Sequence, residues 1–433
     1  MKKHFDTLQI HAGHVPDQDT LSAAVPLYQT ASYQFKDTQH AADLFELRAE
    51  GYIYSRISNP TVAVLEERLA AIENGVGALA LSSGHAAQFI AINNLLNPGQ
   101  NLITSPFLYG GTVSQFKHSF KKLGIEVRFA KSSKPEDFEV LIDENTRGLY
   151  METISNPGFE VPDFDAFSAL SKKYDLPLIV DNTFSGGGYL CKAFDLGANI
   201  VIESATKWIS GNGTSIAGAI IDGGNYNWAN GKFPQFTEPA EEYHGINFSE
   251  NFKELAFIVR ARVIGLRDFG SSLSPFNAFM IIHGLETLSL RMERHCSNAL
   301  ALAKYLKSHP KVDEVFYPGL PDDPNHEVAA KYLSNGFGGV LSFTVKGGKQ
   351  GGHEMVDELK LVSHLANVGD AKTLIIQPST TTHQQLTDKE QIAAGVLPGL
   401  LRVSVGLEHI SDIIQDFEQA FTQSSKGTPD NSK

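Results

Sequence analysis

The sequence is poor in cysteine, and its 433 residues contain no long apolar run. Its two cysteines, Cys191 and Cys296, are too few to cross-link a chain of this length, and neither stands in a metal-binding spacing. We therefore expect no disulfide framework and no metal site. No segment reaches the roughly 20 apolar residues of a spanning helix, and the lysines near the start precede no apolar signal segment. These absences predict a soluble, cytoplasmic protein that does not engage a membrane.

Positive charge is also scarce, with 36 Lys and Arg against 49 Asp and Glu and a net charge of -13. No run of basic residues could neutralise a phosphate backbone, so we expect no nucleic-acid partner. A chain of this length exceeds one compact core, and two or three domains are expected. The size favours an enzyme.

Short apolar runs alternate with helix-length amphipathic stretches between about residues 63 and 309. This alternation predicts an α/β fold in which parallel strands are joined by crossover helices. Polar or small residues follow each run, as expected where the carboxyl ends of buried strands open into a site. The runs that matter most are residues 78–81, 148–151, 176–180 and 199–202.

Changes of pattern along the chain predict three parts. Asn59 can cap, and Pro60 can begin, a helix over 62–72, which sets residues 1–60 apart as an irregular N-terminal arm. Residues 61–274 form the large domain. Residues 275–433 form a smaller α+β domain and a frayed tail from 424. We expect this smaller domain to contain a long helical run from about 276 to 308 and strands at 339–345 and 401–405.

An insertion at residues 222–251 is rich in Gly, Asn, Pro and aromatic residues, which predicts a long ordered loop. We expect its aromatic side chains to help close the functional site. His244 lies in it and His383 lies near another motif; both are expected to be structural rather than catalytic.

Two charged residues follow neighbouring apolar runs. Asp181 comes directly after the run 176–180, and Lys207 follows the run 199–202 by a few residues. Pyridoxal 5′-phosphate (PLP) sites use a lysine that forms a Schiff base and an acid that pairs with the ring nitrogen. Alone, such a pair is more often a turn cap and a surface amine, so the interpretation depends on its surroundings.

A candidate phosphate site supplies those surroundings. Ser83 and Gly84 follow a predicted strand and open a helical pattern over 86–96, where free backbone N–H groups and the helix dipole attract a dianion. An ordinary helix cap is the simpler explanation of that segment by itself. Ser204 and Thr206 place hydroxyl groups on either side of Lys207 that could reach the same phosphate.

The chain resembles the Cys/Met metabolism family of PLP-dependent enzymes over residues 8–421. Seven motifs match in order: Tyr54-Ser55-Arg56-Ile57-Ser58-Asn59-Pro60-Thr61, Ser83-Gly84, Tyr109-Gly110-Gly111-Thr112, Glu152-Thr153-Ile154-Ser155-Asn156-Pro157, Asp181-Asn182-Thr183-Phe184, Ser204-Ala205-Thr206-Lys207 and Arg402-Val403-Ser404-Val405-Gly406-Leu407-Glu408. The resemblance implies PLP as the cofactor. It also implies the PLP-transferase fold of the aspartate aminotransferase type (fold type I), with a mostly parallel central sheet flanked by helices.

The resemblance also implies roles for individual residues. Lys207 is the Schiff-base lysine and proton shuttle, Asp181 is the partner of the ring nitrogen, and Tyr109 stacks on the ring and assists catalysis. Further cofactor-binding positions are Ser83, Gly84, His85, Thr183, Ser204 and Thr206. Relatives usually carry Gln or Met at position 85, but only the backbone N–H of that residue need be shared.

Substrate binding and assembly follow from the same resemblance. Arg402 binds the substrate carboxylate, Asn156 assists it, and Asn367 stands where many lyases carry Ser. Tyr54 and Arg56 reach the phosphate of the neighbouring subunit, and Tyr54 also faces its substrate. The site is then shared between two chains in a homo-oligomer, which the family makes a homotetramer built as a dimer of dimers.

Three features favour one branch of the family, the O-acetylhomoserine sulfhydrylases: Asn367, Gly111 where methionine-degrading lyases carry Cys, and the insertion 222–251. The implied substrates are O-acetyl-L-homoserine and sulfide or methanethiol. The alternatives are a methionine or cystathionine γ-lyase, a cystathionine γ-synthase and, more remotely, a non-catalytic binding protein of the same fold. The sequence does not distinguish an acetyl from a succinyl donor.

Overall fold

The structure, a computed structural model, describes residues 3–156, 158–381, 384, 387, 391 and 395–424. Within them, seven strands form a sheet in the order β1-β7-β6-β5-β4-β2-β3. Strands β2, β3, β4, β5 and β6 pair in parallel, whereas β7 runs antiparallel to both β1 and β6. The predicted mostly parallel α/β sheet is thus confirmed. The strands are β1 (Gly77–Leu81), β2 (Asn101–Thr104), β3 (Glu126–Phe129), β4 (Thr146–Glu152), β5 (Leu178–Asp181), β6 (Ile200–Glu203) and β7 (Gly218–Asp222).

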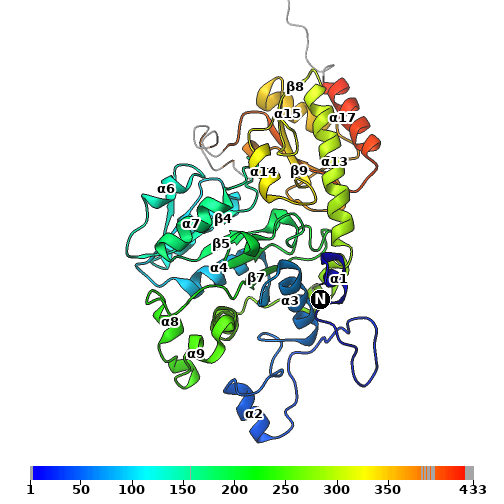
Figure 1. Ribbon diagram of the computed structural model, residues 1–433. Coiled ribbons are helices and arrows are strands. Elements are labelled where there is room, and N and C mark those ends of the chain that lie inside the picture. Colours follow the sequence, from blue (N-terminus) through cyan, green and yellow to red (C-terminus); the bar gives the residue numbers. More distant parts are fainter. Residues whose placement is uncertain are drawn as a thin grey trace, which may run out of the picture.

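Helices cover both faces of this sheet (Figure 1). On one face lie α3 (Pro60–Glu73), α7 (Phe164–Tyr174) and α12 (Pro275–Leu285), and on the other lie α4 (Gly84–Leu95) and α10 (Ala256–Arg260). Strand β4 shows why both faces are apolar: Leu149 and Met151 enter one core, while Tyr150 between them enters the other. Successive side chains of a strand point to opposite faces of the sheet. When both faces are covered, all of these side chains are excluded from water.

A second, smaller sheet has the order β10-β11-β12-β9-β8. Its strands are β8 (Val312–Phe316), β9 (Val340–Val345), β10 (Ser363–His364), β11 (Leu374–Ile376) and β12 (Leu400–Ser404). Helices α13 (Leu288–Ser308), α15 (Gly348–Asp357) and α17 (Ile410–Ser424) pack on it through a core of their own. Figure 1 shows α13 running from this sheet toward the central one.

The remaining α-helices of the described residues have at most eight residues each. They are α1 (Phe5–His11), α2 (Thr38–Phe45), α5 (Gly110–Ser114), α6 (Pro135–Glu139), α8 (Pro234–Thr237), α9 (Phe248–Phe252), α11 (Arg267–Phe269) and α14 (His326–Tyr332). Helix α2 lies in a segment that projects away from the central sheet, at the end opposite the smaller sheet (Figure 1). Among the described residues, no helix combines the length and apolar character needed to cross a membrane. The predicted tail beyond 424 lies outside the described residues.

Helix α3 begins as the sequence predicts. The side chain of Asn59 accepts hydrogen bonds from the backbone N–H groups of Thr61 (2.9 Å) and Val62 (3.4 Å), and Pro60 is the first helical residue. These contacts satisfy N–H groups that have no partner inside the helix.

The helical run predicted over 276–308 consists of two helices, α12 and α13, which are separated at Glu286 and Thr287. The side chain of Gln9 contacts the start of α13. Its Oε1 accepts a hydrogen bond from the backbone N–H of Ser289 at 3.0 Å, in place of a backbone carbonyl one turn earlier. Its Nε2 donates to Oγ of Ser289 at 2.9 Å. A contact between residues 280 positions apart cannot be read from local periodicity.

The insertion 222–251 is ordered and includes α8 and most of α9. Within one chain, its aromatic residues do not line the cavity between the two sheets, contrary to the expectation that they close it. Trp228, Phe233 and Phe236 are buried in a core cluster, and Trp228 stacks on Phe257 of α10 with ring centroids 5.2 Å apart. The insertion therefore stabilises one face of the sheet. His244 is exposed there, and His383 lies outside the described residues.

Candidate active site

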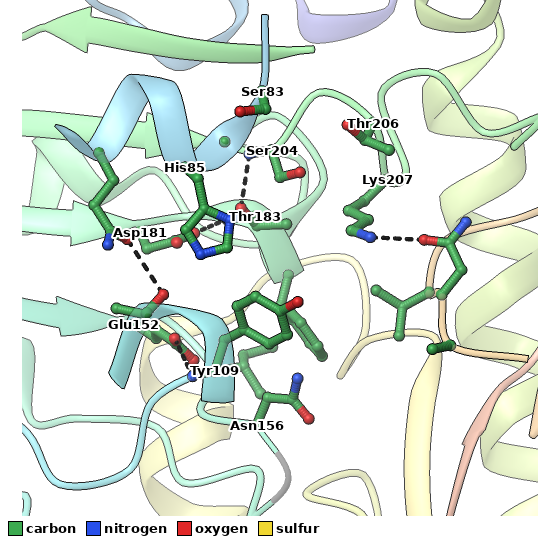
Figure 2. A pocket seen from close by; sticks show the side chains of 18 of the residues that line it. Ser83, His85, Tyr109, Glu152, Asn156, Asp181, Thr183, Ser204, Thr206 and Lys207 are labelled. Atoms are coloured by element: carbon green, nitrogen blue, oxygen red, sulfur yellow. Dashed lines mark hydrogen bonds between the residues drawn. The ribbon is translucent and has the colours of Figure 1, made fainter. Parts of the chain in front are cut away.

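A cavity of about 280 Å³ lies at the carboxyl ends of β4, β5 and β6 (Figure 2). Side chains from the central sheet, from β12 and from the loop before β11 meet in it, so the site lies between the two sheets. The lining residues are Ser83, Gly84, His85, Gln88, Tyr109, Thr112, Glu152, Ile154, Asn156, Asp181, Thr183, Phe184, Ser204, Thr206, Lys207, Ile216, Ala366, Asn367, Val368 and Arg402.

The turn between β1 and α4 forms one side of the cavity. Oγ of Ser83 accepts from the backbone N–H of Ala86 at 3.1 Å, which caps α4. Strand β7 closes the turn from behind: a Cβ added at Gly218 would lie 2.1 Å from the carbonyl oxygen of Ser83. Gly84 packs against Ser204 in the same way: a Cβ added at Gly84 would lie 2.9 Å from the Cβ of Ser204. The helix start is thus held against the loop that carries Lys207.

Asp181 ends β5, and its carboxylate is fixed by two donors. The backbone N–H of Thr183 donates to Oδ1 at 3.0 Å, and the hydroxyl of Tyr150 lies 3.4 Å from Oδ2. The Tyr150 hydroxyl also contacts Oε1 of Gln88 at 2.9 Å. Burial raises the pKa of Asp181, while its hydrogen bonds to Thr183 and Tyr150 oppose that rise. A buried carboxylate with fixed donors is suited to pair with a cationic ring nitrogen.

Lys207 lies in the turn after β6, and β6 pairs directly with the β5 strand of Asp181. Its Nζ donates to Oδ1 of Asn367 at 2.6 Å. Burial and, second, the charge of Arg402 lower the pKa of Lys207 to about 8. The backbone at Gly369, with φ of +75°, comes so close that an added Cβ would lie 2.6 Å from the Trp208 nitrogen. This close approach holds the Asn367 loop against Lys207.

Arg402, on β12, is 6% exposed and reaches the cavity from the smaller sheet. It donates to Oδ1 of Asn156 at 3.2 Å and to the carbonyl oxygen of Asn367 at 3.3 Å, while its buried Nε makes no hydrogen bond within the described structure. Burial lowers the pKa of Arg402 to about 10, so it remains cationic at neutral pH. A buried, incompletely paired guanidinium at a cavity wall is suited to bind a carboxylate.

Tyr109 precedes α5 and is 44% exposed. Its ring lies beside that of His85, with centroids 5.8 Å apart, and Figure 2 shows both rings at the cavity. The backbone N–H of Tyr109 donates to Oε1 of Glu152 at 2.7 Å. A flat cofactor entering the cavity would meet an aromatic face at this wall.

Two sequence-predicted residues lie outside the cavity. Tyr54 is 43% exposed, and the guanidinium of Arg56 lies 5.6 Å from the centre of its ring. Arg56 donates to the carbonyl oxygen of Arg267 instead. Within one chain, these side chains do not line the cavity that holds Lys207.

The residues present fit PLP. Ser83, Gly84 and Ser204 surround a helix start suited to a phosphate dianion, Asp181 supplies the acid for the ring nitrogen, and Lys207 supplies an amine whose pKa is already lowered. Thr206 fits less directly, because its hydroxyl donates to the carbonyl of Ala217 at 3.0 Å.

Sequence reasoning assigned no role to eight of the lining residues. For Glu152 a signal was present, because it ends a buried strand next to that of Asp181, the position where ligand groups are expected. Gln88 lies one turn into α4, where nothing in the sequence marks it. The others are Thr112, Ile154, Phe184, Ile216, Ala366 and Val368.

Comparisons with known proteins agree with this geometry. The model of the Cys/Met metabolism PLP-dependent enzymes matches residues 6–422. The homocysteine/cysteine synthase of Kluyveromyces lactis is 55% identical, covering 97% of this chain and 98% of that protein. The O-acetyl-L-homoserine sulfhydrylase 1 of Thermus thermophilus is 52% identical, covering 96% and 99%.

A solved structure is similar over nearly the whole fold. The crystal structure of a putative O-acetylhomoserine (thiol)-lyase from Campylobacter jejuni superimposes with a TM-score of 0.94 at 36% identity, covering 97% of this chain and 100% of that one. It carries N′-pyridoxyl-lysine-5′-monophosphate, a cofactor joined to a lysine. This chain is therefore a PLP-dependent enzyme and belongs to the Cys/Met metabolism family.

Proposed function

We propose that this enzyme is an O-acetyl-L-homoserine sulfhydrylase. It would join O-acetyl-L-homoserine and sulfide to give L-homocysteine and acetate, and methanethiol in place of sulfide would give L-methionine. The observation that carries the proposal is the convergence of Lys207, Asn367 and Arg402 in one cavity. The names of relatives that are 50–55% identical over nearly the full chain support the same reaction.

The chain's own residues account for the main steps. Bound PLP supplies an electron sink for charge at the carbon that bears the substrate amine. Arg402 and Asn156 bind the substrate carboxylate, and Asp181 keeps the ring nitrogen protonated. Lys207 accepts the Cα proton, because a pKa of about 8 leaves part of its amine neutral near physiological pH.

Replacement at Cγ requires a further proton transfer and a dry site. Tyr109 is placed at the wall where a phenol can assist the proton that moves near Cγ. Acetate departs with the electron pair of its C–O bond, and hydrosulfide forms the new C–S bond at the same carbon. Ile154, Phe184 and Ile216 give the cavity an apolar portion that limits the entry of water.

The site would be completed by a second copy of the chain. Tyr54 and Arg56 do not line the cavity of their own chain and would reach the phosphate of the neighbouring subunit, with Tyr54 also near its substrate. Ile216 lines the cavity yet is 60% exposed in one chain, as expected of a wall that a second chain covers. The assembly would be a homotetramer made of two such dimers, in the cytoplasm.

The division into an arm (1–60), a large domain (61–274) and a smaller domain (275–433) forms part of this proposal. It is supported by the separate apolar core of the smaller sheet. In this division the arm contributes residues to the site of the neighbouring subunit, and the cavity lies where the large and the smaller domain meet.

A single assay tests the reaction. The purified holoenzyme is supplied with O-acetyl-L-homoserine and sulfide, and homocysteine and acetate are measured; equal amounts of both are expected. Brisk release of 2-oxobutyrate from methionine without sulfide would instead identify a γ-lyase. Replacing sulfide by cysteine tests for a cystathionine γ-synthase, and O-succinyl-L-homoserine tests the donor.

A second candidate function concerns the carbon skeleton of the donor. The Kluyveromyces lactis relative is named a homocysteine/cysteine synthase, which favours O-acetyl-L-serine as an additional donor that yields cysteine. Comparing kcat/KM for the two acetylated donors at one sulfide concentration decides between a single and a dual activity.

A further inference from the structure

Glu152 is a buried carboxyl group at the wall of the active-site cavity. It is the last residue of β4, it is 7% exposed, and its register partner on the neighbouring strand is Asp181. It also borders a second cavity of about 10 Å³, which is lined by Ser105 and Ser155 among others and has room for about one water.

Two loops approach this one carboxyl group. The backbone N–H of Tyr109 donates to Oε1 at 2.7 Å, and the backbone N–H of Asn156 lies close enough to the carboxyl group to oppose the rise of its pKa. Tyr109 forms the aromatic wall of the cavity, and Asn156 accepts a hydrogen bond from Arg402. Glu152 therefore connects the cofactor-stacking loop with the loop that orients the substrate-binding arginine.

The carboxyl group is suited to hold position rather than to carry charge. Burial and, second, the neighbouring Asp181 raise its pKa well above the ordinary range. A neutral carboxyl group still accepts hydrogen bonds and adds one O–H donor, for which the small cavity has room for a partner. An ionised form would put two carboxylates at adjacent strand ends, which is unfavourable in a dry site.

We infer that Glu152 is a positioning residue that fixes the Tyr109 loop relative to Asn156 and, through Asn156, aligns Arg402. This inference rests on the roles proposed above for Tyr109 and Arg402. It assigns Glu152 no contact with the reacting atoms.

Binding measurements test the inference without relying on turnover. One measures the affinity of the apoprotein for PLP and the visible circular dichroism of the bound cofactor, which reports the asymmetric ring environment. The other measures the affinity of the holoenzyme for L-norleucine, an amino acid with a carboxylate but no leaving group. If the proposed reaction were wrong, these readouts would still report on Glu152.

Three substitutions separate position from charge. Glu152→Gln keeps the length and an acceptor oxygen and should stay within about threefold of the wild type in both affinities. Glu152→Ala removes the acceptor of the Tyr109 N–H and the group that Asn156 approaches, and it should weaken both affinities by about tenfold or more. Glu152→Asp keeps the charge but retracts the group by one methylene, and it should resemble Glu152→Ala.

Glu136→Gln, the same exchange at an exposed carboxylate of α6, is the matched control and should change neither affinity. Should Glu152→Ala fail to fold, the comparison of Gln with Asp decides. Wild-type behaviour of Asp together with impairment of Gln would show that charge matters and would overturn the inference. So would a Glu152→Ala protein that loses only thermal stability, with unchanged affinities and circular dichroism.

Discussion

The amine of Lys207 and the side-chain oxygen of Asn367 lie 2.6 Å apart, although 160 residues separate them in the sequence. Lys207 follows a strand of the central sheet, whereas Asn367 precedes β11 of the smaller sheet. The backbone carbonyl of Asn367 also accepts from Arg402 at 3.3 Å. One asparagine therefore contacts both Lys207 and Arg402.

Replacing Asn367 by Ser should loosen that relationship, because the shorter side chain cannot reach the amine in the same geometry. We expect kcat/KM for O-acetyl-L-homoserine to fall by roughly tenfold, the value of about one hydrogen bond to a charged group. Steady-state kinetics at saturating sulfide measure the effect. Bound PLP should remain stoichiometric, and a variant that loses the cofactor would contradict this explanation.

Lys207→Ala should abolish turnover, because both the covalent attachment and the proton shuttle are lost. General acid-base catalysis alone contributes about 10² to 10⁴ in rate, so a fall in kcat of at least about 10³ is expected. Borohydride reduction should then fail to fix the cofactor to the protein, as judged by mass spectrometry. Lys304→Ala in α13 is a control outside the cavity, and labelling of the wild type at any lysine other than 207 would refute the assignment.

Arg402→Lys should raise KM for the donor by roughly 10- to 100-fold, because an ammonium group lacks the planar fork that binds a carboxylate through two hydrogen bonds. The value of kcat should change less, since the interaction exists before and during the reaction. Arg294→Lys, at an exposed position of α13, is the matched control. An effect confined to kcat would count against carboxylate binding.

The rate at which PLP loads onto the apoprotein should rise with pH. Only the neutral amine of Lys207 attacks the cofactor aldehyde, so the rate should be low below the pKa and reach a plateau above it, with a midpoint near 8. Arg402→Gln removes a positive neighbour that contributes to the lowered pKa, so the midpoint should move upward. Stopped-flow absorbance follows the loading, and a midpoint near the ordinary lysine value in the wild type would disprove the prediction.

Glu203→Gln should reduce the loss of stability at high pH. Burial, followed by the neighbouring Glu73, raises the pKa of Glu203 well above its ordinary value. The folded state then holds a proton that the unfolded state releases, so stability falls as pH rises above about 4.5, the ordinary value. A neutral amide removes much of this dependence. The difference in Tm between pH 5.5 and 8 should therefore be smaller in the variant, and an equal or larger difference would exclude the explanation.

The parts of the site that lie near strand ends could be predicted from the sequence. Asp181 and Lys207 follow apolar runs, and parallel pairing of β5 with β6 brings them to one edge. Arg402 and Asn156, 246 positions apart, were placed together only by the family motifs. Local sequence patterns contain no information about the contact between Arg402 and Asn156, because this contact depends on how the two sheets pack.

The differences from expectation have the same origin. The start of α13 is bonded by Gln9, a side chain far away in the sequence. The aromatic residues of the insertion are equally compatible with a cavity wall and with a core, and composition alone cannot separate these environments. Glu152 belongs to a family motif, but the sequence indicates no role for it, because its partners are backbone groups that a sequence does not show.

Gly218 has a consequence for the interpretation of mutational screens. Its backbone lies behind the Ser83 turn, where any side chain would collide with a carbonyl oxygen. A substitution there would displace the start of α4. The measured phenotype would be weak retention of PLP through its phosphate. A screen scored by cofactor retention would therefore rank position 218 with the ligand-binding residues, although its own atoms stand outside the site. For this enzyme, sensitivity to mutation at that position would report the close packing of β7 behind the Ser83 turn rather than a contact with the cofactor.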